Sequence, residues 1–333
     1  MKNKIFLYIS LLFITSFLRA EHNKYNFFSK VIIWGYPLHS HTHSYIHWGF
    51  FRAFKHLGYE VHWVSTMKEL DHIDLHNALF ITEGQVDDEM PKRLDCYYIL
   101  HNWDPQKYQE PFFHNRCILL QVYTHDCLKH SVEKIDDYMY CDTQQKLIFI
   151  PWATDLLPNE IDMMKQNIPQ KKMQTIQWVG TIGKGVFGNN IEIDNFKRAC
   201  MENNIVFKNI INRSMEENIA LIKTSYMAPA LQGPFQCEKG YIPCRIFKNI
   251  SYGQWGITNN KTVHDLFKGK IVYNSDTYQL FYDAQEYIRN ASINDLYELM
   301  DFVKNKHTYL NRIETLLSFM KKVLMIKEKN ETC

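Results

Sequence analysis

The chain has 333 residues and a mass of 39.8 kDa, which exceeds one domain of about 100–200 residues and fits two. Hydrophobic residues make up 46% and charged residues 22%, which excludes a disordered tail protein. The formal net charge of +2 gives no general signature of nucleic-acid binding. Eight cysteines, none of them in a CxxC pair, exclude a disulfide scaffold and argue against a zinc ribbon.

The N-terminus has the layout of an export signal. Two lysines fall in residues 1–4, an apolar run covers Ile5–Leu18, and a small residue, Ala20, offers a cleavage point. The apolar run is shorter than the ~20 residues of a membrane-spanning helix. Residues 1–20 therefore predict a signal peptide or a short membrane anchor, with a buried strand as the remaining interpretation. A cleaved signal would make the protein periplasmic, secreted or lumenal, and otherwise the protein would be membrane-associated.

Residues 21–150 alternate short apolar runs with helical or loop spacers. The first run, Lys30–Tyr36, is rich in β-branched residues and ends in Gly-Tyr-Pro, which predicts a buried strand. Ser44 can cap a helix that extends to Leu57. Such a β-α-β unit favours a right-handed parallel crossover, and the repeated pattern predicts a doubly wound α/β domain. The other strands are expected at Tyr59–Val64, Ala78–Thr82, Tyr97–His101, Cys117–Tyr123 and Leu147–Ile150.

A proline-bounded stretch, Pro151–Pro158, follows this block and predicts an interdomain linker over residues 151–159. Residues 160–292 show the same α/β pattern, and residues 293–333 predict one or two amphipathic C-terminal helices. No repeat of about 20–50 residues is visible, which excludes a solenoid. The expected strands of this block are Thr175–Val179, Ile205–Asn209, Tyr226–Gln232 and Gln254–Thr258, and the expected helices are Glu192–Asn203, Ser214–Ile222 and Arg245–Tyr252.

Loops that follow strands carry the candidate site residues, because open α/β sheets bind ligands beyond the carboxyl ends of their strands. The loop after the first strand, with the helix behind it, holds four histidines. They could be bases, donors to an anion or metal ligands, or could form a polar loop without such a role. Two acids that follow strands are candidate general bases. The histidines are His39, His41, His43 and His47, and the acids are Glu83 and Asp126.

The loop Gly180–Gly188 is rich in glycine and contains Lys184. Glycines let the backbone approach a phosphate and the lysine could neutralise it, although such loops are also common as plain turns. The spacing is neither that of a Walker A motif nor G-x-G-x-x-G.

A cationic pair, Arg245 and Lys248, lies near the expected start of a helix. Both side chains could face an anion, aided by the helix dipole, or they could form a solvated face. Few charges surround the pair, which favours a binding site that includes Gln236, Pro243 and Phe247 as well.

Together these segments resemble the GT-B glycosyltransferases, in particular the group 1 branch with its spore-maturation-type sequences, over most of the chain after residue 30. The segment 149–158 (FIPWATDLLP) resembles the interdomain segment of that family. The segment 178–185 (WVGTIGKG) resembles the first strand and glycine loop of its nucleotide-binding domain. The segment 240–260 (GYIPCRIFKNISYGQWGITNN) is similar to its donor-site helix and the strand that follows.

The donor-site helix matches the family pattern in part. Arg245, Phe247 and Gly253 stand where the pattern requires them. Lys248 stands where the family has a glutamate that binds the ribose or sugar of the donor, and Gly240 occupies the first acidic position of the E-x7-E pattern. A lysine cannot accept the hydrogen bonds that a glutamate accepts, so a different mode of donor binding is expected.

The resemblance implies two Rossmann-like domains that face a cleft and transfer a sugar from a nucleotide sugar. No metal ion and no other cofactor is implied, because the diphosphate leaving group is stabilised by a helix dipole, backbone N–H groups and cations. The expected donor-binding residues are Gly180, Thr181, Lys184, Gln236, Pro243, Arg245, Phe247, Lys248 and Thr258.

The acceptor, a glycan, lipid or protein, is expected under the histidine loop, with closure of the domains about the linker excluding water. An inverting enzyme would need a base such as His41, Glu83 or Asp126, whereas a retaining enzyme would not. A non-catalytic glycan- or nucleotide-binding protein on the same scaffold and, more remotely, a GT-B epimerase are the alternative predictions. No nucleic-acid partner is expected, and peripheral contact with a membrane is left open.

Overall fold

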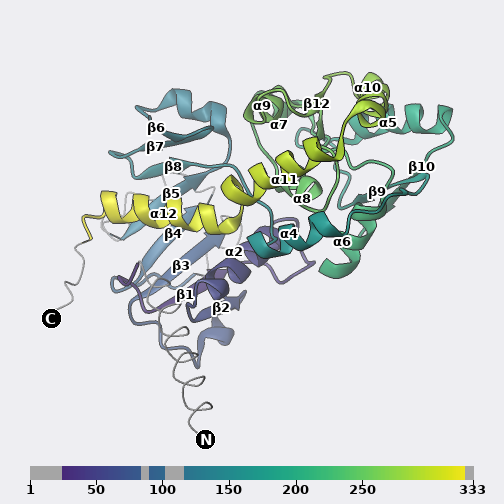
Figure 1. The fold of residues 1–333 in the computed structure, drawn as a ribbon. Coiled ribbons are helices and arrows are strands. Elements are labelled where there is room, and N and C mark those ends of the chain that lie inside the picture. Colours follow the sequence, from purple (N-terminus) through teal and green to yellow (C-terminus); the bar gives the residue numbers. More distant parts are fainter. Residues whose placement is uncertain (1–24, 84–89, 102–115, 327–333) are drawn as a thin grey trace, which may run out of the picture.

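The computed structural model describes residues 25–83, 90–101 and 116–326, which form two lobes (Figure 1). The N-terminal lobe is built on the strands up to residue 150, and the C-terminal lobe on residues 158–306. The predicted signal peptide or anchor at residues 1–20 lies outside the described residues and stays a prediction. Within the described ranges, no helix combines the length and the apolarity needed to cross a membrane.

The N-terminal lobe is organised around a sheet with eight strands in its described part, in the order β2-β1-β3-β4-β5-β8-β7-β6. From β2 to β8 all neighbours are parallel, and β7 and β6 are added antiparallel. The predicted α/β class is thereby confirmed. Because the strand order reverses next to β1, the loop after β1 lies at a topological switch point. The strands are β1 (Lys30–Trp34), β2 (Val61–Val64), β3 (Ala78–Glu83), β4 (Tyr97–His101), β5 (Cys117–Gln121), β6 (Glu133–Asp136), β7 (Met139–Asp142) and β8 (Leu147–Phe149).

The parallel strands are apolar throughout because both faces of the sheet are covered. Along β1, alternate residues of Val31–Trp34 enter two different cores. One core lies under helices α2 (Ser44–His56) and α12 (Tyr309–Val323), and the other lies on the opposite face. The continuous apolar run of the sequence is thus split by the pleat of the strand.

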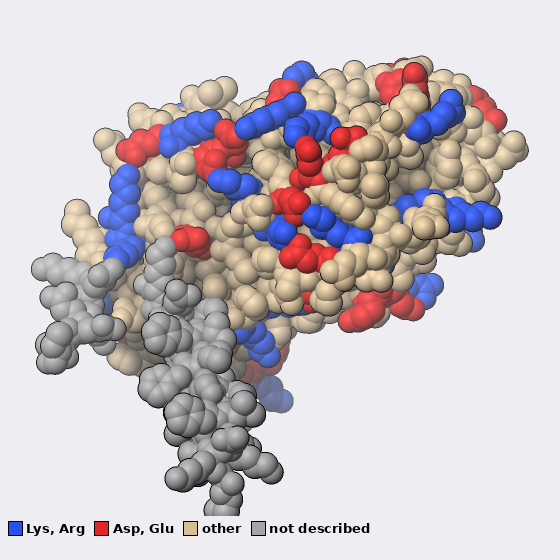
Figure 2. All heavy atoms as spheres, viewed as in Figure 1, with Lys and Arg blue, Asp and Glu red and all other residues tan. Residues whose placement is uncertain are grey.

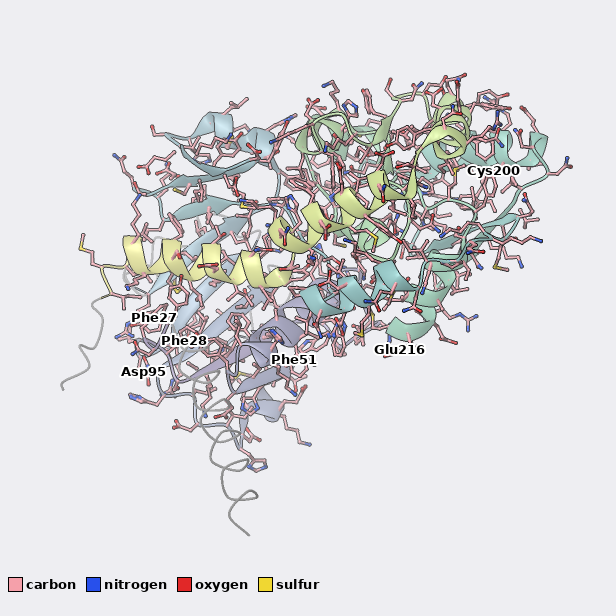
Figure 3. The ribbon with its side chains drawn as sticks, in the orientation of Figure 1. Phe27, Phe28, Phe51, Asp95, Cys200 and Glu216 are labelled. Carbon is pink, nitrogen blue, oxygen red and sulfur yellow. The ribbon has the colours of Figure 1, made fainter. Side chains whose placement is uncertain are left out.

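The chain enters β1 from an aromatic cluster. Phe27 and Phe28 lie next to each other (Figure 3), and their rings meet edge to face with centres 5.1 Å apart. Phe28 also stacks on Tyr59, with ring centres 5.0 Å apart. These contacts tie the start of the described chain to the strand pair β1–β2.

The C-terminal lobe contains two short parallel strand pairs enclosed by helices (Figure 1). The segment Tyr226–Gln232, predicted as a strand, lies between the pairs. Its first N–H donates to Thr175 in β9, and the N–H of Ala230 donates to Ile257 in β11. These bonds are too few for a strand, so the sheet of this lobe is interrupted. The elements are α4 (Pro158–Gln166), β9 (Thr175–Val179), α5 (Asn190–Glu202), β10 (Val206–Ile210), α6 (Met215–Thr224), α7 (Pro234–Glu238), α8 (Cys244–Ser251), β11 (Ile257–Thr258), α9 (Lys261–Leu266), β12 (Val272–Tyr273) and α10 (Thr277–Asn290).

The C-terminal tail forms two helices that serve different lobes. Helix α11 (Ile293–Lys306) packs against α4 and α8, whereas α12 crosses to the N-terminal lobe and packs on α2 (Figure 1). The break falls at His307 and Thr308, where the Thr308 side chain accepts a hydrogen bond from the N–H of Asn311 and caps α12.

Arg312 fixes the point where α12 enters the N-terminal lobe. Its side chain is fully buried and donates to the carbonyl oxygens of Pro151, Trp152 and Lys306 at 2.7–3.0 Å. It also donates to Nδ1 of His307 at 2.8 Å. Burial lowers the pKa of Arg312 to about 9. The chain leaves the N-terminal lobe at Pro151 and returns to it after Lys306, so the chain crosses between the lobes twice. The Arg312 side chain bonds to both of these crossings.

The hairpin of β6 and β7 was not predicted, and its sequence explains why. Strand β6 is mostly exposed and charged, so it lacks the apolar pattern that identifies a strand. It is held by its pairing with β7 rather than by burial.

His307 makes the stability of the protein depend on pH. Burial, followed by the nearby charges of Arg312 and Lys306, lowers the pKa of His307 well below 6.5. Below about pH 6.5 the unfolded chain therefore binds a proton that the folded chain does not, and stability falls as the pH falls.

The variant His307→Phe keeps a ring against Phe247. Between pH 7 and pH 5.5, we expect its free energy of unfolding to fall by about 1 kcal/mol less than that of the wild type. Urea denaturation of both proteins at the two pH values measures this difference. Because the other histidines are common to both proteins, their contributions cancel. Identical pH dependence would contradict the assignment to His307.

Candidate functional site

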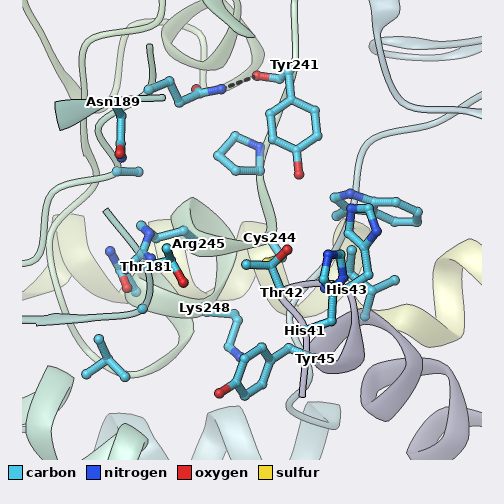
Figure 4. Close-up of a pocket in the computed structure, with 18 of the residues that line it drawn as sticks. His41, Thr42, His43, Tyr45, Thr181, Asn189, Tyr241, Cys244, Arg245 and Lys248 are labelled. Atoms are coloured by element: carbon cyan, nitrogen blue, oxygen red, sulfur yellow. Dashed lines mark hydrogen bonds between the residues drawn. The ribbon is translucent and has the colours of Figure 1, made fainter. Parts of the chain in front are cut away.

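The two lobes enclose a cavity of about 640 Å³, here called the interlobe cavity (Figure 4). One wall comes from the loops after β1 and β5 and from the end of β4. The other wall comes from the loops after β9 and β10 and from the start of α8. These segments lie at the carboxyl ends of parallel strands, the usual position of ligand sites in such sheets.

Arg245 projects into the cavity from the first turn of α8 (Figure 4). Its guanidinium carbon lies 3.9 Å from the centre of the Trp178 ring, which is a cation–π contact. Burial lowers the pKa of Arg245, an effect that the nearby Cys244 and Tyr241 only partly offset. Within the part of the chain that the structure describes, Arg245 forms no ion pair with an aspartate or glutamate, and neither residue type lines the cavity. No described carboxylate therefore neutralises this partly buried cation, which leaves it able to bind an anion.

Gly180 makes room for the Arg245 guanidinium. Its φ of +130° lies in the region that favours glycine, and a Cβ placed there would be 2.7 Å from Arg245 Nη2. Because Gly180 has no side chain, it leaves room for the Arg245 guanidinium and also allows the backbone to turn.

Lys248 lies one turn further along α8 and has a partner that the sequence did not reveal. Its Nζ is 3.0 Å from Oδ2 of Asp155 in the linker, and the two side chains are only 9% and 2% exposed. The Tyr252 hydroxyl donates to Oδ1 of Asp155 at 2.7 Å. Lys248 lines the cavity, but Asp155 neutralises its charge, so Arg245 is the stronger candidate to bind an anion.

Three of the predicted histidines, His39, His41 and His43, line the opposite wall together with His101 at the end of β4. Nδ1 of His39 lies 3.2 Å from the Tyr45 hydroxyl. The N–H of His43 donates to Nδ1 of His41 at 3.3 Å, which leaves Nε2 of His41 to carry the proton when the ring is neutral. The histidine loop is therefore an ordered part of the wall.

His47 and Glu83 have other surroundings. His47 lies within α2, is 2% exposed and does not line the cavity. Its ring covers Gly35, where any Cβ would overlap it, because the helix turns this position toward the sheet. Glu83 ends β3, and its side chain lies outside the described part of the structure.

Asp126 does not reach the cavity either. It lies in the short helix η4 (Thr124–Lys129) and pairs with Lys129 at 2.8 Å and with Lys239 at 3.3 Å. Burial raises its pKa, but the hydrogen bonds from the two lysines outweigh this and hold the pKa below its ordinary value. The geometry gives Asp126 a role in joining the lobes rather than in proton transfer.

In the C-terminal lobe, Thr181, Gln236 and Pro243 line the cavity beside Gly180 and Arg245.

Three residues that were predicted with them do not line the cavity: Lys184, Phe247 and Thr258. Lys184 is exposed in the glycine loop. Phe247 is fully buried and stacks on His307 with ring centres 4.5 Å apart. Thr258 is fully buried and its hydroxyl donates to the carbonyl of Ala230.

A second contact between the lobes borders the cavity. Tyr123 and Tyr241 form an antiparallel bridge, and the Thr124 hydroxyl donates to the Gly240 carbonyl at 2.7 Å. Gly240 has a φ of +63°, and a Cβ there would overlap the ring of His125. The position at which the related pattern has an acid is therefore occupied by the neighbouring lobe.

The described cavity wall contains Arg245 and Lys248 but neither aspartate nor glutamate. Across the described residues, no group of three or more His, Cys, Asp or Glu side chains is placed to hold a metal ion. The absence of a metal from the function remains a prediction.

Sequence reasoning missed Asp155, Trp178 and His101. Asp155 and Trp178 lie inside the two segments quoted for the resemblance, but their partners come from α8, far along the chain. His101 ends a predicted strand. The rule that ligands bind beyond the carboxyl ends of strands, which was applied to the other loops, could have identified it as a candidate.

No protein-family model matches the chain, and no curated protein matches it. Solved structures do share its fold. An α-glucosyltransferase in complex with UDP and a 13-mer DNA containing an HMU base has a TM-score of 0.55 at 9% identity, over 87% of this chain and 98% of its own. An α-glucosyltransferase in complex with UDP has a TM-score of 0.54 at 9% identity, over 87% and 99%.

A UDP-forming α,α-trehalose-phosphate synthase from Burkholderia xenovorans has a TM-score of 0.45 at 10% identity, over 77% of this chain and 76% of its own. The two α-glucosyltransferases confirm the two-lobed GT-B fold expected from the resemblance. The narrower expectation, the spore-maturation-type branch, is not confirmed by them.

The Lys248–Asp155 pair gives a prediction about stability. We expect Lys248→Met to lower the free energy of unfolding by about 3–5 kcal/mol, because it leaves a buried carboxylate without its cation. Combining it with Asp155→Asn removes both charges and should recover most of that loss. Urea denaturation of the wild type, both single variants and the double variant measures the coupling. Additive losses would show that the two side chains do not act as a pair.

Proposed function

We propose that the protein transfers a glycosyl group from a nucleoside diphosphate sugar to an acceptor held against the N-terminal lobe, without a metal ion. The observation that carries the proposal is Arg245, a partly buried cation without a described carboxylate partner, at the start of α8 in the interlobe cavity. An anionic ligand would complete this site.

The diphosphate of the donor suits this position for two reasons. The first N–H groups of α8 have no side-chain cap, so they and the helix dipole favour negative charge. The Arg245 guanidinium can form two parallel hydrogen bonds to phosphate oxygens. When the bond to the sugar breaks, negative charge grows on the leaving diphosphate, and both groups are already oriented to stabilise it.

The acceptor would lie across the cavity, against the histidine loop. His41 is the only one of the three predicted bases that the described structure places in the cavity wall. An inverting reaction requires a base for the acceptor hydroxyl. Because Nε2 carries the proton of the neutral ring, His41 could take the proton only at Nδ1, after its hydrogen bond from the His43 N–H is released. The acceptor class, a glycan, lipid or protein, stays as predicted from the sequence.

Lys248 does not argue against donor binding. Its charge is satisfied by Asp155, so it contributes a neutral ion pair to the wall rather than a second free cation. The main reason to prefer a non-catalytic binding protein is thereby weakened.

The fold neighbours supply the first nucleotide to test, since two of them were solved with UDP. One of them also holds DNA. For this chain we retain the prediction of no nucleic-acid partner, because its net charge is +2 and the face in Figure 2 mixes positive and negative side chains.

We expect Arg245→Ala to weaken the binding of UDP by about 10–100-fold, because a charge-assisted contact to phosphate is lost. Calorimetric titration measures the affinity, and a chelator added to the wild type should leave it unchanged. Arg198→Ala is the matched control, because Arg198 also stacks on an aromatic ring, Tyr278, but does not line the cavity. Equal binding by wild type and Arg245→Ala would refute the proposed donor site.

Turnover is tested separately by following the hydrolysis of UDP-glucose and its transfer to added sugars or lipids. Release of UDP that depends on Arg245 supports an enzyme. Binding of the nucleotide without any release under all conditions would favour the binding-protein alternative.

Gly180→Ala should also weaken UDP binding, by about tenfold or more, because its methyl group displaces the Arg245 guanidinium. Gly185→Ala is the control. Gly185 also has a positive φ, of +77°, so alanine meets backbone strain there too, but a Cβ there has no neighbour within 4 Å. If both variants lose affinity equally, backbone strain rather than the arginine contact explains the loss.

A further inference from the structure

Asn218 has a buried oxygen that lacks a partner. The residue lies in α6, lines the interlobe cavity and is 7% exposed. Its Oδ1 is fully buried and accepts no hydrogen bond. A buried acceptor of this kind destabilises the free protein, and in native structures it commonly marks a place that a ligand or water completes.

Two other asparagines in the cavity wall show what a structural role looks like. Asn189 accepts a hydrogen bond from the N–H of Gly183 and donates to the carbonyl of Leu231. Asn249 donates to the carbonyl of Ala228 at 2.8 Å. Both side chains hold backbone segments together, whereas the Asn218 oxygen holds nothing.

The surroundings of Asn218 are apolar. Ile222 follows it by one helical turn on the same face of α6, and Ile222, Val179 and Ile211 line the cavity as well. Val179 directly precedes Gly180, which contacts the Arg245 guanidinium. The cavity that holds Arg245 is therefore also lined by apolar side chains and the Asn218 amide.

We propose that Asn218 recognises the nucleobase of the donor, an inference that rests on the proposed function. A nucleobase is flat and largely apolar on its faces, and its edge places a hydrogen-bond donor next to an acceptor. The Asn218 amide is complementary to such an edge: Oδ1 accepts from a base N–H, and the amide nitrogen donates to the adjacent ring nitrogen or oxygen. The diphosphate then binds at Arg245.

The test uses the wild type and Asn218→Leu, which has nearly the same volume and no polar atom. Calorimetric titrations with UDP, ADP, GDP, CDP and inorganic pyrophosphate measure affinity, and the melting temperature measures stability. We expect the variant to bind the preferred nucleoside diphosphate about tenfold more weakly and to bind pyrophosphate as the wild type does. We also expect a higher melting temperature, because the buried oxygen without a partner is gone.

A purely structural Asn218 would give the opposite stability result. A lower melting temperature, with equal weakening of pyrophosphate and nucleotide, overturns the inference. Should Asn218→Leu fail to fold, Asn218→Ser shortens the side chain, keeps a polar group and is expected to weaken nucleotide binding alone.

The remaining outcomes separate this inference from the function it rests on. Unchanged affinity of Asn218→Leu for the preferred nucleoside diphosphate overturns the base assignment and leaves the donor site at Arg245 intact. A wild type that binds none of the five ligands overturns both. Because these probes carry no transferable sugar, a selective loss cannot come from recognition of the transferred sugar. The four nucleoside diphosphates share the ribose, so a loss that differs among them comes from the base, and an equal loss for all four assigns Asn218 to the ribose and overturns the inference.

Discussion

One buried cation, satisfied almost entirely by backbone carbonyls, holds together the two segments by which the chain crosses between the lobes. Arg312 bonds to carbonyl oxygens on both crossings of the chain, at Pro151 and Trp152 on the way out and at Lys306 on the way back. A buried charge of this kind tolerates little displacement, because every lost carbonyl leaves it poorly solvated. The positions of these two crossings therefore contribute to how the two walls of the interlobe cavity face each other.

Arg245 shows the opposite arrangement of the same chemical group. Arg312 has its partners supplied by the fold, whereas Arg245 has an aromatic ring beneath it and an open cavity before it. A cation with a structural role and a cation available to bind a ligand can thus be distinguished by their partners alone. Asn218 differs from Asn189 and Asn249 in the same way, because its buried oxygen has no partner whereas their side chains bond to backbone carbonyls.

Much of the fold could be predicted from the sequence, because parallel strands buried on two faces leave apolar runs that are easily seen. The strands at Tyr97–His101 and Thr175–Val179 match the prediction at both ends. The exposed β6 strand, which has no such run, was missed. Within the site, loops after strands were found, but the roles of Lys248 and Phe247 were not, since Asp155 and His307 approach them from distant segments. Spacing along a helix gives no information on such partners.

The hydrogen bond of Asn249 has a consequence for the chemistry that this chain can undergo. Residues 249–251 read Asn-Ile-Ser, the acceptor sequence for an N-linked glycan. The nitrogen that such a glycan would occupy is the one that donates to Ala228, in a side chain that is 2% exposed. Glycosylation at this position and a folded α8 therefore exclude each other. If this chain is translocated in a cell that glycosylates chains as they pass, the C-terminal lobe folds only from molecules in which Asn249 has not been modified.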